Sequence, residues 1–323
     1  MKGNQFTFAD RFEGISGSAI REIFKLLGVP GMISFAGGNP SVSALPDEKV
    51  AYAADKALRA DGKRILQYGA TEGYGPFIES LLEYVQTVIG KKTAKEEVLP
   101  ITGSTQGMDL LCKTLINPGD VILVESPTFL GNMQAMRLAQ AKLVSVESDQ
   151  QGLLMEALEE KMIAHRPKML YTIPNFQNPT GKTLPLERRK KIAELAEKYG
   201  VVVAEDDPYR DLRYAGSHLP TIKELDSSGM VVYLGSFSKI ISPGMRVGYL
   251  VGDPQIIRKC TIAKQSSDLH TANINQAIID VFLRENLLNQ HIATICKDYQ
   301  IQMEAMLGHT DKFPEGTEIT RPE

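Results

Sequence analysis

The sequence has few cysteines, and their spacing suggests neither a metal site nor a disulfide framework. Cys112, Cys260 and Cys296 are an odd, scattered set without a CxxC pair, which fits a reducing compartment and argues against a zinc site. A chain of 323 residues can bury a sizeable core, so its stability needs neither disulfides nor metals. We therefore expect a cytoplasmic protein with no bound metal.

The sequence also lacks the segments that direct a chain to a membrane or to nucleic acid. Its N-terminus, MKGNQFTFADRFEG, has no apolar core of the kind found in signal peptides. No uninterrupted apolar run approaches the length of a membrane span. The formal net charge is −3, and lysine and arginine are spread along the chain without a basic tract. A small molecule is therefore the expected partner.

From about Glu97 onward, apolar runs alternate with amphipathic stretches, as is typical of a βα protein. Five apolar runs are predicted strands: 121–124, 142–146, 169–173, 201–204 and 231–234. Residues 186–199 are a predicted helix that places Ile192, Leu195, Ala196 and Tyr199 on one face. The pattern predicts an α/β fold with a mostly parallel central sheet flanked by helices, whose ligands bind at the carboxyl ends of the strands.

The segment SFSKIISPGMRVGY, residues 236–249, directly follows a predicted strand. An isolated Ser-Lys pair is usually a solvated loop with a surface lysine. The longer pattern, however, resembles the SxSKxxxPGxRxG signature of the fold-type I aminotransferases of class I and II, which use pyridoxal 5'-phosphate (PLP). The resemblance implies that Lys239 holds the cofactor aldehyde as a Schiff base and, once freed, acts as general base at the substrate α-carbon. Arg246, Ser236 and Ser238 would then bind the cofactor phosphate.

The segment VAEDDPY, residues 203–209, ends another predicted strand with acidic residues. By itself it is most simply a strand end with solvated carboxylates. It also resembles the D-x-x-Y pattern of the same family, which implies that Asp206 bonds the ring nitrogen of the cofactor and keeps it protonated. Tyr209 would donate to the phenolic oxygen of the ring.

The segment NFQNPTG, residues 175–181, is an ordinary turn by composition. In the family, the asparagine of the NPTG motif also reaches the phenolic oxygen. The resemblance therefore gives this role to Asn178, beside the substrate.

The segment TGSTQG, residues 102–107, opens a predicted helix with Leu110, Leu111 and Leu115 on one side. Free N–H groups and the dipole at a helix N-terminus favour phosphate, although a plain N-cap is the alternative. The family resemblance implies that Ser104 and Thr105 contact the phosphate, with threonine where relatives more often have glutamine.

After the next strand, Phe129 occupies the place of an aromatic that stacks on the cofactor ring in the family, where relatives often have tyrosine. The alternative is an ordinary core aromatic.

Three N-terminal segments extend the resemblance. ISFAGGNP, residues 33–40, resembles the SFAGGLP stretch of the 2-aminoadipate and kynurenine aminotransferase subgroup, where Gly38 would offer its N–H to the substrate carboxylate. LQYG, residues 66–69, implies that Tyr68 crosses a homodimer interface to the partner's phosphate, unless it is only an aromatic anchor in a turn. Arg21 lies in a segment that resembles a mobile helix beside the substrate, and it would recognise an acidic substrate side chain unless it belongs to a solvated face.

Together these motifs predict a PLP-dependent aminotransferase that moves an amino group from an amino acid to a 2-oxo acid, with 2-oxoglutarate as the expected acceptor. Lyase, decarboxylase or racemase chemistry is an alternative, because the same cofactor core supports several reactions. A ligand-sensing regulator of the MocR type is a further one, but only about thirty residues precede Ser34, too few for a DNA-reading domain. The motifs do not identify the amino donor.

The two ends of the chain depart from the βα pattern. We expect an N-terminal arm and small-domain segment at 1–45, a large PLP-binding domain at 46–275, and a connecting helix with the start of a truncated small domain at 276–323. Residues 273–307 read as one long helix. No motif after Arg246 matches the arginine that grips the substrate α-carboxylate in the family, and Arg321 lies too early in the pattern for that role. We therefore expect a truncated chain that builds the cofactor site but turns over poorly.

Overall fold

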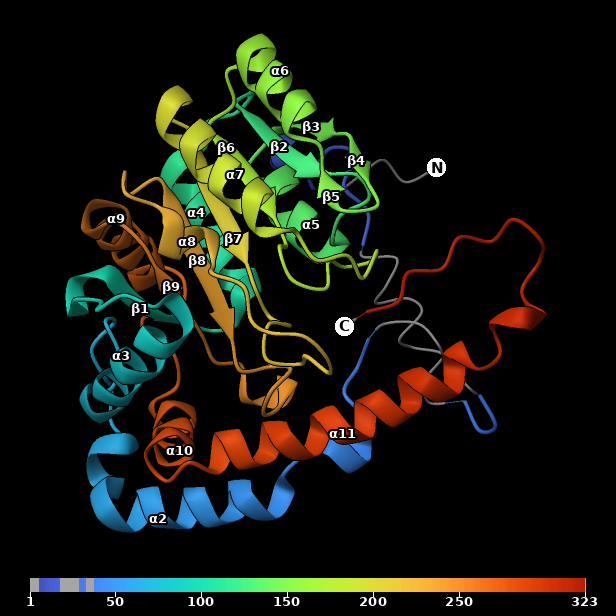
Figure 1. Ribbon diagram of the computed structural model, residues 1–323. Coiled ribbons are helices and arrows are strands. Elements are labelled where there is room, and N and C mark those ends of the chain that lie inside the picture. Colours follow the sequence, from blue (N-terminus) through green and yellow to red (C-terminus); the bar gives the residue numbers. More distant parts are fainter. Residues whose placement is uncertain (1–5, 18–28, 33–37, 323) are drawn as a thin grey trace.

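The computed structural model describes residues 6–17, 29–32 and 38–322, and its centre is a seven-stranded sheet (Figure 1). The strand order is β1-β9-β8-β7-β6-β2-β3. The neighbours from β3 to β8 are parallel, whereas β9 is antiparallel to both β8 and β1. The predicted α/β fold with a mostly parallel sheet is confirmed. The strands of the sheet are β1 (Val98–Ile101), β2 (Val121–Glu125), β3 (Lys142–Val146), β6 (Met169–Thr172), β7 (Val202–Asp206), β8 (Val231–Ser236) and β9 (Gly248–Val251).

All five predicted strands are present, with ends shifted by at most two residues. The sequence pattern did not single out β1 and β9, because a strand of four residues is too short for its periodicity to stand out. A small hairpin, β4 (Ser148–Asp149) and β5 (Gly152–Leu153), follows β3.

Helices cover both faces of the sheet, as predicted (Figure 1). Successive strand residues point to opposite faces. In β7, Val203 packs in one buried cluster with α6, α7 and α8, and Ala204 packs in another with α4, α5 and α9. The bounds are α4 (Ser104–Leu115), α5 (Leu130–Leu138), α6 (Met155–His165), α7 (Leu186–Tyr199), α8 (Ile222–Leu225) and α9 (Pro254–Gln265).

Helix α7 has the bounds that the sequence predicts. Ile192, Leu195 and Ala196 are fully buried against the sheet, and Tyr199 packs at the edge of the same cluster. The helix ends at Gly200, whose φ of 64° places it in the left-handed region and whose N–H bonds the Ala196 carbonyl oxygen. Glycine adopts this conformation without the steric cost of a Cβ, which explains where the helix stops.

The expectation of one helix over residues 273–307 is wrong. The structure has two helices there, α10 (Asn273–Arg284) and α11 (Leu287–Leu307). The break lies at Glu285 and Asn286, and Asn286 has a φ of 59°. Asparagine tolerates the left-handed region better than most residues, so the chain can turn there although both flanking segments are amphipathic.

A third buried cluster joins α10 to α2 (Asp47–Ile65), α3 (Gly75–Ile89) and the β8–β9 end of the sheet. Helix α11 buries only its first half, through residues such as Leu288 and Ile295, and then extends away from the sheet (Figure 1). The predicted domain boundaries at 45–46 and 275–276 remain predictions. Short 3-10 helices lie at Asp10–Phe12, Val42–Ala44, Lys95–Glu97, Pro243–Met245 and Thr310–Lys312.

Within the described ranges, no helix is both long enough and apolar enough to span a lipid bilayer.

Candidate active site

Lys239 lies shortly after β8, at the carboxyl edge of the sheet. Its Nζ donates a hydrogen bond to the Gly38 carbonyl oxygen at 2.9 Å. Burial lowers the pKa of Lys239, and the positive charge of Arg246 lowers it further. Both causes favour the neutral amine, which is the form that attacks a carbonyl carbon.

Asp206 ends β7 and is 2% exposed. Its Oδ2 accepts two hydrogen bonds, from the Tyr171 hydroxyl at 2.7 Å and from Asn132 Nδ2 at 2.9 Å. Its Oδ1 is buried and has no hydrogen-bond partner among the described residues. Burial raises the pKa of Asp206 to about 7, against the lowering effect of the Tyr171 hydrogen bond. A buried oxygen without a partner is costly, so Oδ1 is suited to a donor that is not part of the chain.

The NPTG and D-x-x-Y segments meet, as their positions after neighbouring strands β6 and β7 predict. Asn178 Nδ2 donates to the Tyr209 hydroxyl oxygen at 3.1 Å. Gln177 holds the loop in place, since its Nε2 donates to the Pro127 carbonyl oxygen at 2.8 Å and its Oε1 accepts the Thr180 N–H at 2.9 Å. Two polar groups therefore face one another beside Asp206.

Arg246 lies against the start of α4, where its Nη2 donates to the Thr102 carbonyl oxygen at 3.2 Å. Gly103 makes this approach possible. A Cβ built on Gly103 would lie 2.1 Å from Arg246 Nη2, and the φ of Gly103 is +83°. The helix N-terminus at Ser104 and the guanidinium thus form one positively polarised corner suited to an anion.

Comparison with known proteins agrees with this geometry. The family model described as aminotransferase class I and II matches residues 30–313. The chain belongs to this family. It is 38% identical to aromatic-amino-acid aminotransferase 1 of Thermococcus litoralis, over 98% of this chain and 77% of that protein. It is 40% identical to 2-aminoadipate transaminase of Thermus thermophilus, over 95% of this chain and 77% of that protein.

The solved structure of the Pyrococcus horikoshii kynurenine aminotransferase superposes with a TM-score of 0.92 at 38% identity, covering 98% of this chain and 80% of that one. The predictions of fold type I, of the 2-aminoadipate and kynurenine subgroup, and of a PLP-dependent aminotransferase are confirmed.

The residues of this aminotransferase fit its cofactor. The buried, unpaired Oδ1 of Asp206 suits a protonated ring nitrogen, and the corner formed by Arg246 and the α4 N-terminus suits a phosphate. Ser104 is half-buried and Thr105 exposed at the same helix start. In the loop that carries Lys239, the Ser238 N–H donates to Ser236 Oγ at 3.2 Å.

Two further predicted residues lie close to the aminotransferase site. Phe129 precedes α5 and packs against the same cluster as Tyr209, with its ring over Gly131, where a Cβ would lie 2.5 Å from the ring. Gly38 contacts Lys239 through its carbonyl oxygen. Ring stacking by Phe129 and substrate binding by the Gly38 N–H remain predictions.

The structure does not bring all predicted residues together in one chain. Tyr68 is 80% exposed, and its ring meets the edge of His270 with centroids 6.3 Å apart. Its predicted role requires a second subunit and stays a prediction. Arg21 lies outside the described residues.

Sequence reasoning missed Asn132 and Tyr171, the two partners of Asp206. Tyr171 is fully buried inside β6, and Asn132 is fully buried on α5. A hydroxyl in an apolar strand and an amide on a buried helix face are the signals that could have drawn attention to them. Neither signal indicates that the hydrogen-bond partner is Asp206.

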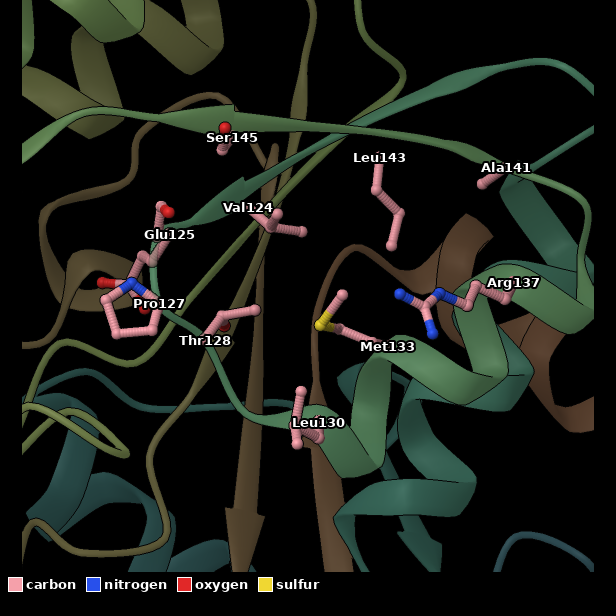
Figure 2. Close-up of a pocket in the computed structure, with 11 residues that line it drawn as sticks. Val124, Glu125, Pro127, Thr128, Leu130, Met133, Arg137, Ala141, Leu143 and Ser145 are labelled. Atoms are coloured by element: carbon pink, nitrogen blue, oxygen red, sulfur yellow. The ribbon is translucent and has the colours of Figure 1, made fainter. Parts of the chain in front are cut away.

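Figure 2 shows a cavity of about 510 Å³ between the end of β2, α5 and the edge strand β3. Apolar side chains such as Val124, Met133 and Leu143 line it together with Arg137. Lys239, Asp206 and Arg246 do not line it.

Proposed function

We propose that this aminotransferase transfers the amino group of an amino acid to a 2-oxo acid, with 2-oxoglutarate among its acceptors, and that Lys239 carries the cofactor. The observation that carries the proposal is the convergence of Lys239, Asp206 with its unpaired Oδ1, and the Asn178–Tyr209 pair at one edge of the sheet. When bound, PLP supplies an electron sink that stabilises negative charge at the substrate α-carbon.

Lys239 has two tasks in the proposal. It would hold the cofactor covalently, and once free, its Nζ would remove and return the proton at the substrate α-carbon. A lysine with an ordinary pKa is almost fully protonated at neutral pH, and an ammonium group can neither attack nor accept a proton. Burial and the charge of Arg246 lower the pKa of Lys239, which raises the fraction of neutral amine.

The remaining residues orient the cofactor. With the cofactor bound, Asp206 Oδ1 would accept the ring N–H, Asn178 and Tyr209 would donate to the phenolic oxygen, and Phe129 would stack on the ring. Phosphate binding is assigned to the residues around the α4 N-terminus and the lysine loop: Ser104, Thr105, Ser236, Ser238 and Arg246. Gly38, Asn178 and Arg21 are the proposed substrate contacts.

The names of the relatives support a proposal for the donor class. The Thermococcus protein is named for aromatic amino acids, the Thermus protein for 2-aminoadipate and the Pyrococcus protein for kynurenine. We therefore include aromatic amino acids, 2-aminoadipate and kynurenine in the proposed donor range of this chain.

A labelled-donor assay tests the proposal. Each ¹⁵N-labelled amino acid is incubated with the PLP-loaded protein and 2-oxoglutarate, and ¹⁵N-glutamate is measured by mass spectrometry. Transfer should occur with wild type and fall at least a thousandfold in Lys239→Ala, since covalent attachment and proton transfer are both lost. Lys190→Ala, on the exposed face of α7, is the matched control and should behave as wild type. Release of CO₂ or racemised donor without labelled glutamate would favour a decarboxylase or racemase instead.

Borohydride reduction of the loaded protein tests the lysine assignment separately. Peptide mapping should find the cofactor on Lys239. The contrasting candidate is the buried Lys264, whose Nζ already bonds Asp268 at 2.8 Å. Label on Lys264 would show that the assignment is wrong.

A further inference from the structure

Asp206, Tyr171 and Asn132 form a closed triangle of hydrogen bonds beneath the cofactor site. The Tyr171 hydroxyl donates to Asp206 Oδ2 at 2.7 Å, and Asn132 Nδ2 donates to the same oxygen at 2.9 Å. Asn132 Nδ2 also lies 3.0 Å from the Tyr171 hydroxyl oxygen, to which it donates. The three residues come from β7, β6 and α5, and all are at most 2% exposed.

The triangle makes the two oxygens of Asp206 unequal. A tyrosine hydroxyl has one hydrogen to donate, and here Asp206 accepts it. Both donors bond Oδ2, while Oδ1 is buried and has no partner in the described part of the chain. A partial rotation of the carboxyl group about its Cβ–Cγ bond would stretch both bonds, so the two donors hold its plane and keep one oxygen turned away from them.

The same donors act on the charge of Asp206. Burial, the largest cause, and the neighbouring Asp207 raise the pKa of Asp206, whereas the hydrogen bonds from Tyr171 and Asn132 lower it. Burial and the charge of Asp206 raise the pKa of Tyr171 well above its usual value, so its hydroxyl stays protonated and remains a donor. The two donors therefore oppose burial, which favours the neutral acid, the form that does not stabilise a protonated ring nitrogen.

The protein satisfies only one end of the Asn132 amide. Its Oδ1 is buried and has no partner among the described residues. A buried acceptor without a hydrogen bond destabilises the fold, so packing alone does not explain an amide here. The side-chain bonds that Asn132 does make are its donations to Asp206 and Tyr171.

We infer that Asn132 and Tyr171 are positioning residues that hold Asp206 through Oδ2 and leave Oδ1 alone to face the cofactor ring nitrogen. The inference rests on the proposed role of Asp206. Asn132 lies three residues after Phe129, at the start of α5. The same helix end would therefore position both the Phe129 ring that stacks on the cofactor and the Asn132 amide that bonds Asp206.

The test uses the single variants Tyr171→Phe, Asn132→Leu and Asp206→Asn. It also uses two double variants, in which Asp206→Asn is combined with Tyr171→Phe or with Asn132→Leu. Two quantities are measured: the PLP dissociation constant of the apoprotein by equilibrium dialysis, and the ¹⁵N chemical shift of bound PLP labelled at the ring nitrogen. Each of Tyr171→Phe and Asn132→Leu should weaken PLP binding roughly tenfold, because a hydrogen bond to a charged group is lost. Each should also shift the ring nitrogen toward its unprotonated position.

The combined variants separate positioning from packing. In the Asp206→Asn background, Tyr171→Phe and Asn132→Leu should add nothing to either quantity, since they act through the carboxylate. Tyr199→Phe is the matched control. Its hydroxyl bonds Glu159 at 2.8 Å on the far helix face, and its removal should change neither quantity.

The outcomes distinguish the inference from the proposed function. If Asp206→Asn weakens binding and shifts the ring nitrogen while the other two variants do neither, the positioning role is wrong and the role of Asp206 stands. An Asp206→Asn variant with wild-type values for both quantities overturns the role of Asp206 and the inference with it. If Tyr171→Phe weakens PLP binding equally in the wild-type and Asp206→Asn backgrounds, its effect is one of packing only. That result also overturns the positioning role.

Discussion

At the scale of single residues, Gly103 determines how closely Arg246 can approach the start of α4. A Cβ on residue 103 would lie only 2.1 Å from Arg246 Nη2, so the guanidinium fits there only because residue 103 is glycine. We expect Gly103→Ala to weaken PLP binding by at least tenfold, because the added methyl group displaces Arg246 and the φ of +83° disfavours alanine. The measurement is the PLP dissociation constant of the apoprotein.

Two comparisons make this prediction specific. Pyridoxal, which lacks the phosphate, should bind Gly103→Ala and wild type almost equally. Gly119→Ala is the matched control, since Gly119 has a similar φ of +89° but no atom of the described residues lies within 4 Å of where its Cβ would be. Equal losses for PLP and pyridoxal would point to general distortion of the loop.

Ionised Asp206 also lowers the stability of the folded apoprotein, and this effect should depend on pH. Its pKa of about 7 lies above the ordinary value of 3.8, so the folded apoprotein binds this proton more tightly than the unfolded chain. Its contribution to stability is therefore full below about pH 4 and is lost as pH rises through 7. The charged groups facing it, Asp207 and Glu125, act in the same direction when ionised.

We expect Asp206→Asn to make the apoprotein more stable than wild type at pH 8, by roughly 2 to 4 kcal/mol, with little difference near pH 4. Asparagine carries no charge, so it avoids the desolvation penalty of a carboxylate. Denaturant unfolding at the two pH values measures the difference. An Asp206→Asn apoprotein that is less stable than wild type at pH 8 contradicts the prediction.

At the scale of elements, α7 supports the loop that carries Asn178. Arg189, on this helix, is fully buried. Its Nε donates to the Leu184 carbonyl oxygen at 2.8 Å, and its Nη1 to that of Pro220 at 3.1 Å. Its Nη2 bonds the Pro174 carbonyl oxygen at 3.0 Å and Asn175 Oδ1 at 2.6 Å. One guanidinium therefore joins the helix to the start of the loop.

We expect Arg189→Met to lower the free energy of unfolding by about 3 to 5 kcal/mol, because several buried acceptors lose their donor at once. Lys190→Met is the control. Lys190 pairs with Glu187 on the solvent side, and exposed pairs contribute little, so its change should be within about 0.5 kcal/mol. A similar small change in Arg189→Met would show that water replaces the lost donor.

The elements also show where sequence patterns are informative. Helix α7 was predicted with its observed bounds, because its apolar face is a local signal that the sequence shows directly. The break between α10 and α11 was missed, because the flanking segments share one amphipathic pattern and Asn286 is a weak stop signal compared with glycine. The short strands β1 and β9 were missed for lack of length.

At the scale of the whole molecule, we predict a homodimer. Tyr68 is 80% exposed, and Leu66 beside it is 76% exposed, so this segment offers apolar surface to a second subunit. Sedimentation of the PLP-loaded protein should give twice the chain mass of 35.6 kDa. Tyr68→Phe should weaken PLP binding about tenfold, because a hydrogen bond to a charged phosphate is lost. A monomer that binds PLP tightly would contradict the prediction.

By itself, the sequence determined the convergence of Lys239, Asp206 and Asn178. Each lies in a short polar segment directly after an apolar strand, and parallel strands end at the same edge of a sheet, so their order along the chain already implies that they meet. Only the tertiary structure decided the partners of Asp206. Tyr171 and Asn132 lie 35 and 74 positions away in the chain. A hydrogen bond between distant segments leaves no periodicity in either one, because it depends on how strands and helices pack and not on local spacing.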